Sequence, residues 1–122
     1  MTIIVQDAGF QADDWTGAVL ELAGDDLPAD WTQVLAAPLV RIRFPAFSDG
    51  RGFTLARALR AQGFRGRLRA AGPLLPDQYA MLRRTGFDEV ELTAEHAASH
   101  PESAWLVRAD WQAHDYRSRL AG

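Results

Sequence analysis

Short stretches in which apolar and charged residues alternate strictly are the feature that most limits how this chain can fold. Val40-Arg-Ile-Arg-Phe44, Arg67-Leu-Arg-Ala70 and Glu89-Val-Glu-Leu92 follow this pattern. Because successive side chains of a strand point to opposite faces, each stretch predicts a β-strand with one apolar face and one charged face. Residues 51–62 and 75–84, which lie between the stretches, have the apolar spacing of helices. The sequence therefore predicts consecutive strand–helix units.

Strands this short, joined by helices of about ten residues, predict parallel pairing with right-handed crossovers. The order from residue 18 onward is β-α-β-α-β-α-β-α, which fits a half-barrel of four units, (β/α)4, or a small doubly wound, Rossmann-like sheet. Strands covered by helices on both faces usually read as continuous apolar runs, and these do not. We therefore expect the helices on one face, which favours the half-barrel. The opposite face would carry an arginine–glutamate ladder, either as cross-strand ion pairs on a solvated or dimer-facing sheet or as an anion pocket.

The rest of the chain completes a single α/β domain over residues 1–122, a length that suits one domain. Residues 2–6 and 18–22 predict two further strands. The polar, glycine-containing segment at 7–16 between them predicts a loop.

Two further helices are expected. Residues 27–37 predict one of them, with Asp26 as its N-cap. Ser99 and Glu102 have the spacing of a capping box, which predicts a final helix reaching about Arg117.

Charge and residue usage limit the class of function. The formal net charge of −3 argues against a general nucleic-acid binder. The chain has no cysteine, and its first residues lack the pattern of a secretion signal. No apolar run is long enough to cross a membrane, so we expect a cytoplasmic protein. His96 and His100 have no partner at a recognisable ligand spacing, so no metal site is predicted. No dinucleotide or nucleotide fingerprint indicates a cofactor.

The most suggestive segment for chemistry follows the strand that ends at Phe44. Ligands of parallel α/β sheets bind outside the carboxyl ends of the strands, and a helix is predicted to begin here. Glycines that expose backbone N–H groups at a helix start, with an arginine beside them, attract phosphate, sulfate or carboxylate groups. The alternative is a simple N-cap and turn. The candidate anion-binding residues of this turn are Ser48, Asp49, Gly50, Arg51 and Gly52.

The next strand–helix connection would lie along the same rim of the sheet. Asp49 and Asp77 are the candidates for acid–base chemistry, and Asp77 alternatively interacts only with its own helix terminus. Whether the protein is a catalyst stays open. The further candidate ligand residues are Arg43, Arg69, Gly72, Asp77 and Gln78.

Three ordered motifs resemble an uncharacterised bacterial family, domain of unknown function 934. Residues 44–53, Phe-Pro-Ala-Phe-Ser-Asp-Gly-Arg-Gly-Phe, are similar to its signature F-P-x-F-x-D-G-R-[GS]-[YF]. Residues 66–78 resemble G-x-L-R-A-x-G-x-x-x-x-D-Q, and residues 84–92 resemble R-x-G-F-[DE]-x-x-[EV]-L. The chain has Thr85 where members often have cysteine.

The resemblance implies a place in sulfur metabolism, because members are described as oxidoreductases or accessory proteins of sulfite reduction. It implies an accessory or regulatory protein of assimilatory sulfate or sulfite reduction that binds a small oxyanion or a phosphosulfate nucleotide. One alternative is an enzyme of the same pathway that uses a borrowed cofactor of unknown identity. The other is a structural module that docks on sulfite reductase or another sulfur-assimilation protein, or that forms a homodimer.

Overall fold

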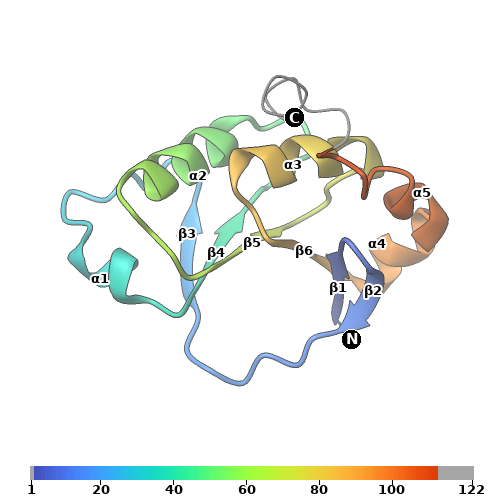
Figure 1. Ribbon diagram of the computed structural model, residues 1–122, viewed down its shortest axis with the longest axis horizontal. Coiled ribbons are helices and arrows are strands. Elements are labelled where there is room, and N and C mark those ends of the chain that lie inside the picture. Colours follow the sequence, from blue (N-terminus) through green and yellow to red (C-terminus); the bar gives the residue numbers. More distant parts are fainter. Residues whose placement is uncertain (1, 113–122) are drawn as a thin grey trace.

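The three alternating stretches form adjacent strands of a six-stranded sheet in the computed structural model of the protein, which describes residues 2–112 (Figure 1). Their order across the sheet is β2-β1-β6-β5-β4-β3. Strands β3 to β6 are parallel neighbours in chain order, whereas β1 pairs antiparallel with β6 and β2. The predicted α/β fold with a mainly parallel sheet is confirmed. The strands are β1 (Thr2–Gln6), β2 (Gly9–Ala12), β3 (Leu20–Ala23), β4 (Leu39–Arg43), β5 (Arg67–Ala71) and β6 (Glu89–Thr93).

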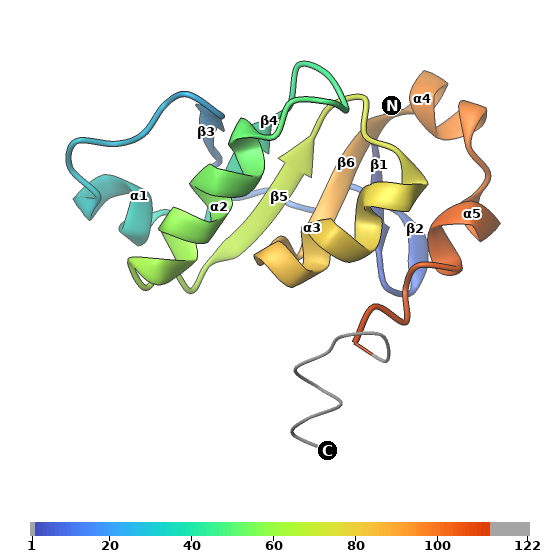
Figure 2. The ribbon, with the colours of Figure 1, turned by 90° about the horizontal axis from the view of Figure 1, so that it is seen from above.

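Two helices cover one face of the sheet. Helices α2 and α3 lie side by side above the parallel strands, and α4 and α5 lie at the end formed by β1 and β2 (Figures 1 and 2). A short 3-10 helix, η1, leads directly into α3. The helical segments are α1 (Thr32–Ala36), α2 (Arg51–Ala61), η1 (Pro76–Gln78), α3 (Tyr79–Thr85), α4 (Ala94–Ser99) and α5 (Glu102–Leu106).

The core lies between this helical layer and the apolar face of the strands. Ile42, Leu68 and Val90 come from the three central parallel strands, and each is at most 1% exposed. Leu55 and Leu59 of α2 belong to the same cluster. Burial of such side chains stabilises the fold by roughly 1.5–3 kcal/mol each. The alternation that predicted the strands therefore also decides which face the helices cover.

The loop predicted at residues 7–16 is wrong for part of its length. Residues 9–12 form β2, which continues the sheet as a hairpin with β1. Phe10 packs against the core, and its N–H donates to Glu102 Oε2 at 2.8 Å. Packing and hydrogen bonds contributed from α5, far along the chain, stabilise a strand that its own polar composition does not predict.

The helix predicted at residues 27–37 is shorter, because α1 begins only at Thr32. Asp26 does not cap it. Its carboxylate accepts the N–H of Ala23 at 2.8 Å and closes the turn after β3. Asp30 accepts the Thr32 N–H at 2.9 Å in the same manner. Aspartate side chains offer the backbone local partners that compete with helix formation, so residues 27–31 stay outside the helix.

The capping box predicted at Ser99 does not form, since Ser99 is the last residue of α4. Helix α4 itself was not predicted. Residues that precede proline are disfavoured in the helical region, and His100 before Pro101 is extended, with φ −135° and ψ 113°. Helix α5 follows Pro101 and ends at Leu106. The end of the predicted helix, near Arg117, lies outside the described residues.

Candidate functional site

The charged face of the sheet is a network of cross-strand ion pairs. The strand register aligns Arg41, Arg69 and Glu89 in one row across β4, β5 and β6. Arg69 Nε donates to Glu89 Oε2 at 2.6 Å, and both side chains are 1% exposed. Arg67 Nε donates to the other oxygen of Glu89 at 2.9 Å. The predicted arginine–glutamate ladder is confirmed.

Arg69, a predicted ligand residue, is enclosed by carboxylates of the protein itself. Its Nη1 donates to Glu91 at 2.9 Å, and both terminal nitrogens contact Asp13 at 3.2 Å. Burial lowers the pKa of Arg69, but hydrogen bonds to Asp13 and Glu89 outweigh burial and hold that pKa above the usual arginine value. The segment around Asp13 crosses this face, with Trp15 lying 5.4 Å from the Arg67 guanidinium. A ligand could reach Arg69 only by displacing Asp13.

The predicted anion-binding turn is engaged in an internal ion pair. Asp49 Oδ1 accepts the N–H of Arg51 at 3.0 Å, and Asp49 Oδ2 accepts from the Arg51 guanidinium at 2.8 Å. These hydrogen bonds, the side-chain one first, lower the pKa of Asp49 to about 2. Ser48 and Gly50 are exposed on the same turn. The carboxylate of Asp49 therefore already occupies the place beside Arg51 that an external anion would take.

Two glycines of this rim are required by close packing. A Cβ on Gly52 would lie 2.4 Å from the Phe44 ring, because α2 starts directly above that ring. Gly72 has φ +138°, and a Cβ there would lie 2.1 Å from the Phe44 carbonyl oxygen. Positive φ of this kind strongly favours glycine. Close packing against the Phe44 ring therefore explains Gly52, and the backbone conformation together with the Phe44 carbonyl explains Gly72.

Gln78 joins the two predicted rim segments. Its Nε2 donates to the carbonyl of Phe47 at 2.6 Å, and its Oε1 accepts the N–H of Leu75 at 2.9 Å. The carboxyl ends of β4 and β5 therefore lie along one rim, as the sequence predicts. Asp77 points elsewhere: its side chain is 82% exposed and accepts from Arg108 at 2.7 Å. No contact joins Asp77 to Asp49.

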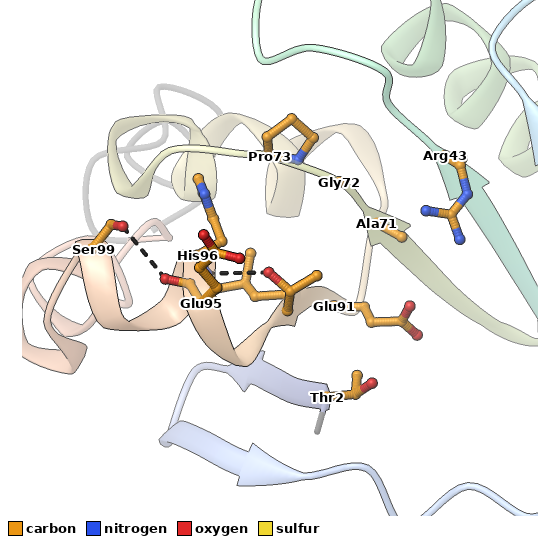
Figure 3. Close-up of a pocket in the computed structure, with 11 residues that line it drawn as sticks. Thr2, Arg43, Ala71, Gly72, Pro73, Glu91, Glu95, His96 and Ser99 are labelled. Atoms are coloured by element: carbon orange, nitrogen blue, oxygen red, sulfur yellow. Dashed lines mark hydrogen bonds between the residues drawn. The ribbon is translucent and has the colours of Figure 1, made fainter.

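A cleft of about 420 Å³ opens where β4, β5 and β6 end (Figure 3). Its volume lies in the range of small-molecule sites, and its position is the one at which parallel α/β sheets bind ligands. Gly72 is the predicted ligand residue that lines it, together with Arg43, which was predicted to assist. Its lining residues include Thr2, Arg43, Gly72, Glu91, Glu95 and His96.

His96 is the cleft residue that sequence reasoning passed over. Its Nε2 lies 2.6 Å from the Leu74 carbonyl, which can only accept, so Nε2 carries the proton. Nδ1 is then the nitrogen that can accept a hydrogen bond. Thr93 fixes the start of α4 by accepting the N–H of His96 at 3.1 Å. Thr93, a residue type that commonly caps helices, was the signal in the sequence that a helix carrying His96 starts at the end of this strand.

A second polar cluster lies at the opposite end of β1. The carboxylate of Asp7 accepts from the hydroxyl of Tyr79, from Arg83 at 3.2 Å and from Trp111 at 3.3 Å. Burial raises the pKa of Asp7, but the hydrogen bonds from these three side chains outweigh it and leave the pKa below its usual value. Burial and the bond to Asp7 raise the pKa of Tyr79. This cluster ties the turn after β1 to α3.

Comparison with protein families gives one match. The model of a family described as "bacterial protein of unknown function (DUF934)" matches residues 19–118. The chain belongs to this family. The DUF934 match covers β3 to α5 and therefore includes every element that lines the cleft except β1. No curated protein and no solved structure matches the chain.

Two further observations bear on the kind of site. Within residues 2–112, no three or more histidine, aspartate or glutamate side chains are grouped so that they could hold a metal ion. None of the helices in that part of the chain has both the length and the apolar character needed to cross a membrane.

Proposed function

We propose that this DUF934 member is an accessory or regulatory protein of assimilatory sulfate or sulfite reduction that binds an anionic ligand in the cleft. The ligand is a small oxyanion or the anionic group of a phosphosulfate nucleotide. The pathway rests on the family resemblance. The binding role rests on one observation, the position of Arg43 at the cleft. Nε and Nη2 of Arg43 donate to Glu21, while Nη1 has no hydrogen-bond partner among residues 2–112.

Arg43 is better suited to an external anion than the other predicted arginines. Its side chain is 50% exposed, compared with 1% for Arg69. Arg51 is exposed too, and its Nε and Nη2 are paired with Asp49 as those of Arg43 are with Glu21. However, its Nη1 lies 3.9 Å from Asp25 Oδ2, and Arg51 does not line the cleft. A guanidinium with one pair of donors free can still bind an oxyanion while its other donors keep it oriented.

Calorimetric titration with sulfate, sulfite and a phosphosulfate nucleotide tests this function. We expect binding of at least one of them, and a loss of about tenfold or more in Arg43→Gln. Arg65→Gln is the matched control, because Arg65 is exposed and does not line the cleft. Absence of binding for all three ligands, or equal affinity in Arg43→Gln and the wild-type protein, contradicts the proposal.

A docking role is the second candidate, and exposed apolar side chains favour it. Phe47 is 52% exposed and Val107 is 66% exposed. Val107 lines a groove of about 390 Å³ between η1 and α5, together with Leu75 and Pro76. Purified sulfite reductase should bind the protein, and Val107→Asp should weaken that binding while Leu27→Asp, also on an exposed apolar side chain, should not. Equal binding by the two variants would contradict a docking role for this groove.

A catalytic role through Asp49 is less favoured than binding. General acid–base catalysis requires a pKa near the working pH, and hydrogen bonds hold the pKa of Asp49 near 2.

For the architecture, we propose that β3 to β6 curl as half of a β/α barrel. Their unbroken order and the placement of α2 and α3 over one face support this (Figure 2). We further propose a cytoplasmic location.

A further inference from the structure

The cleft exists because a small residue interrupts the second row of the charged face. Along this face the strand register aligns Arg43, Ala71 and Glu91 across β4, β5 and β6. In the neighbouring row the central position is Arg69, whose guanidinium fills the space between the flanking strands. Ala71 has only a methyl group at the equivalent position. Arg43 and Glu91 therefore face each other across an opening, on either side of Ala71 (Figure 3).

The two flanks of this opening carry opposite charges. Arg43 keeps Nη1 free of hydrogen bonds to residues 2–112. Across the opening, Oε1 of Glu91 accepts from Arg41 and Arg69, while its Oε2 has no hydrogen-bond partner in the described chain. Glu95 lies on the same side at the start of α4, is exposed, and makes no ion pair with any described residue. One free cationic donor therefore faces two carboxylates.

A simple anion is not the best complement to this arrangement. Bound at Arg43, it would be attracted by the guanidinium and repelled by Glu95 and by the free oxygen of Glu91. A ligand that also carries an ammonium group would turn both repulsions into attractions. Ammonium donors also suit the remaining acceptors: Oε2 of Glu91, the Glu95 carboxylate and Nδ1 of His96. Proteins commonly achieve specificity by placing charges that repel competing ligands, as these carboxylates would repel a ligand that is only an anion.

We propose that the ligand of the cleft is a zwitterion of the α-amino acid class, with its carboxylate at Arg43 and its ammonium group at Glu91 and Glu95. This inference rests on the proposed use of the cleft as a ligand site with Arg43 as its anion donor, and it goes beyond the oxyanions by requiring a ligand that carries both charges close together. The cleft of about 420 Å³ is large enough for a side chain in addition to the two charged groups.

Thermal-shift measurements with the twenty L-amino acids, each added singly to the whole protein, identify the tightest probe. Calorimetric titration then compares that amino acid with its N-acetyl derivative, which lacks the ammonium charge, and with its amide, which lacks the carboxylate. We expect each derivative to bind at least tenfold more weakly than the free amino acid. Sulfate is titrated in parallel as the anion-only ligand.

Variants of the two flanks separate the two charges. Glu95→Gln should weaken amino acid binding about tenfold while sulfate binding stays equal or becomes stronger. Arg43→Gln should abolish binding of both ligands. Asp14→Asn is the control for a lost exposed carboxylate away from the cleft, and it should change neither affinity.

The outcomes distinguish this inference from the proposed function. If sulfate binds through Arg43 but the N-acetyl derivative binds as tightly as the free amino acid, the zwitterion inference is overturned and the anion-binding function stands. If sulfate binds but no amino acid does, the zwitterion inference is likewise overturned and the anion-binding function stands. If no amino acid binds, and none of sulfate, sulfite and the phosphosulfate nucleotide binds, both proposals fail. Amino acid binding that needs Arg43 and Glu95, without binding of the sulfur oxyanions, supports the inference and removes the oxyanions as ligands.

Discussion

Replacement of Arg69 by methionine tests whether buried ion pairs hold the charged face together. The change keeps most of the apolar volume and removes the guanidinium that bonds Glu89, Glu91 and Asp13. Glu89, at 1% exposed, loses its shortest bond but keeps the one from Arg67 at 2.9 Å. Removing one partner of a buried pair costs about 3–5 kcal/mol. Because Glu89 keeps a cationic partner, we expect the lower end, about 3 kcal/mol.

Urea denaturation followed by tryptophan fluorescence measures this loss. With a slope of about 1.5 kcal/mol per molar urea, which is typical of a small domain, the midpoint should fall by about 2 M. Arg65→Met is the matched control, since Arg65 is exposed, and it should change the free energy of unfolding by less than about 0.5 kcal/mol.

A second substitution tests whether Arg69→Met loses stability through the disrupted ion pair or through poorer packing. Arg69→Met combined with Glu89→Leu removes both buried charges, so the double variant should regain part of the stability that Arg69→Met loses. The reasoning is refuted if Arg69→Met unfolds within about 0.5 kcal/mol of the wild-type protein. It is also refuted if the double variant is less stable than the single one, because the weakened pairing of the buried Glu89 carboxylate would then not be the source of the loss.

Three further predictions concern stability, the first two measured by the same urea denaturation and the third by melting temperatures. Gly72→Ala should lower the free energy of unfolding by more than about 1 kcal/mol, because the new Cβ meets the Phe44 carbonyl at a positive φ. Gly50→Ala is the control, since a Cβ there has nothing within 4 Å, and it should lose less. Equal losses in the two variants would contradict this prediction. Gln78→Ala removes the hydrogen bond to the Phe47 carbonyl, which joins the two rim segments, and the local one from the Leu75 N–H. It should cost about 1 kcal/mol, with an unchanged midpoint as the opposing result. Asp7 has a depressed pKa when folded, so its contribution is present above the unfolded value of 3.8 and is lost as pH falls through the folded value. Melting temperatures at pH 6 and pH 2.5 should therefore differ less in Asp7→Asn than in the wild-type protein, and an equal or larger difference would argue against it.

The parallel centre of the fold was predictable from the sequence because its signal is local. Alternation within five residues decides both the strand and the face that each side chain occupies, as in Arg67–Ala71. Strand β2 was not predictable in this way. Its backbone pairs with β1, and Phe10 finds its partner in Glu102 of α5. Contacts that join residues far apart in the chain leave no periodic trace in the segment that they stabilise.

The candidate site, too, was predictable only where its signal is local in the sequence. The sequence predicts that the segments after β4 and β5 share a rim, and Gln78 joins them. The sequence also predicts site residues from their charged groups, such as Asp49 and Arg69. In the structure, Asp49 pairs with Arg51 and Arg69 pairs with Glu89. The cleft depends instead on Ala71, which has no functional group, and on His96 of a helix that was not predicted. A space left by a small side chain becomes visible only when the strands are aligned.

The charged face also dictates how the strands align. Strands β4 and β5 are five residues long, and apolar contacts over such a short length discriminate weakly between neighbouring alignments. A slip of β5 by one residue would turn Arg69 into the apolar layer under α2 and bring Leu68 out among the carboxylates. A guanidinium without a partner in that layer would be strongly unfavourable. The buried arginine therefore makes an alignment shifted by one residue much less stable than the observed one, so that charge burial helps to determine the register of the sheet.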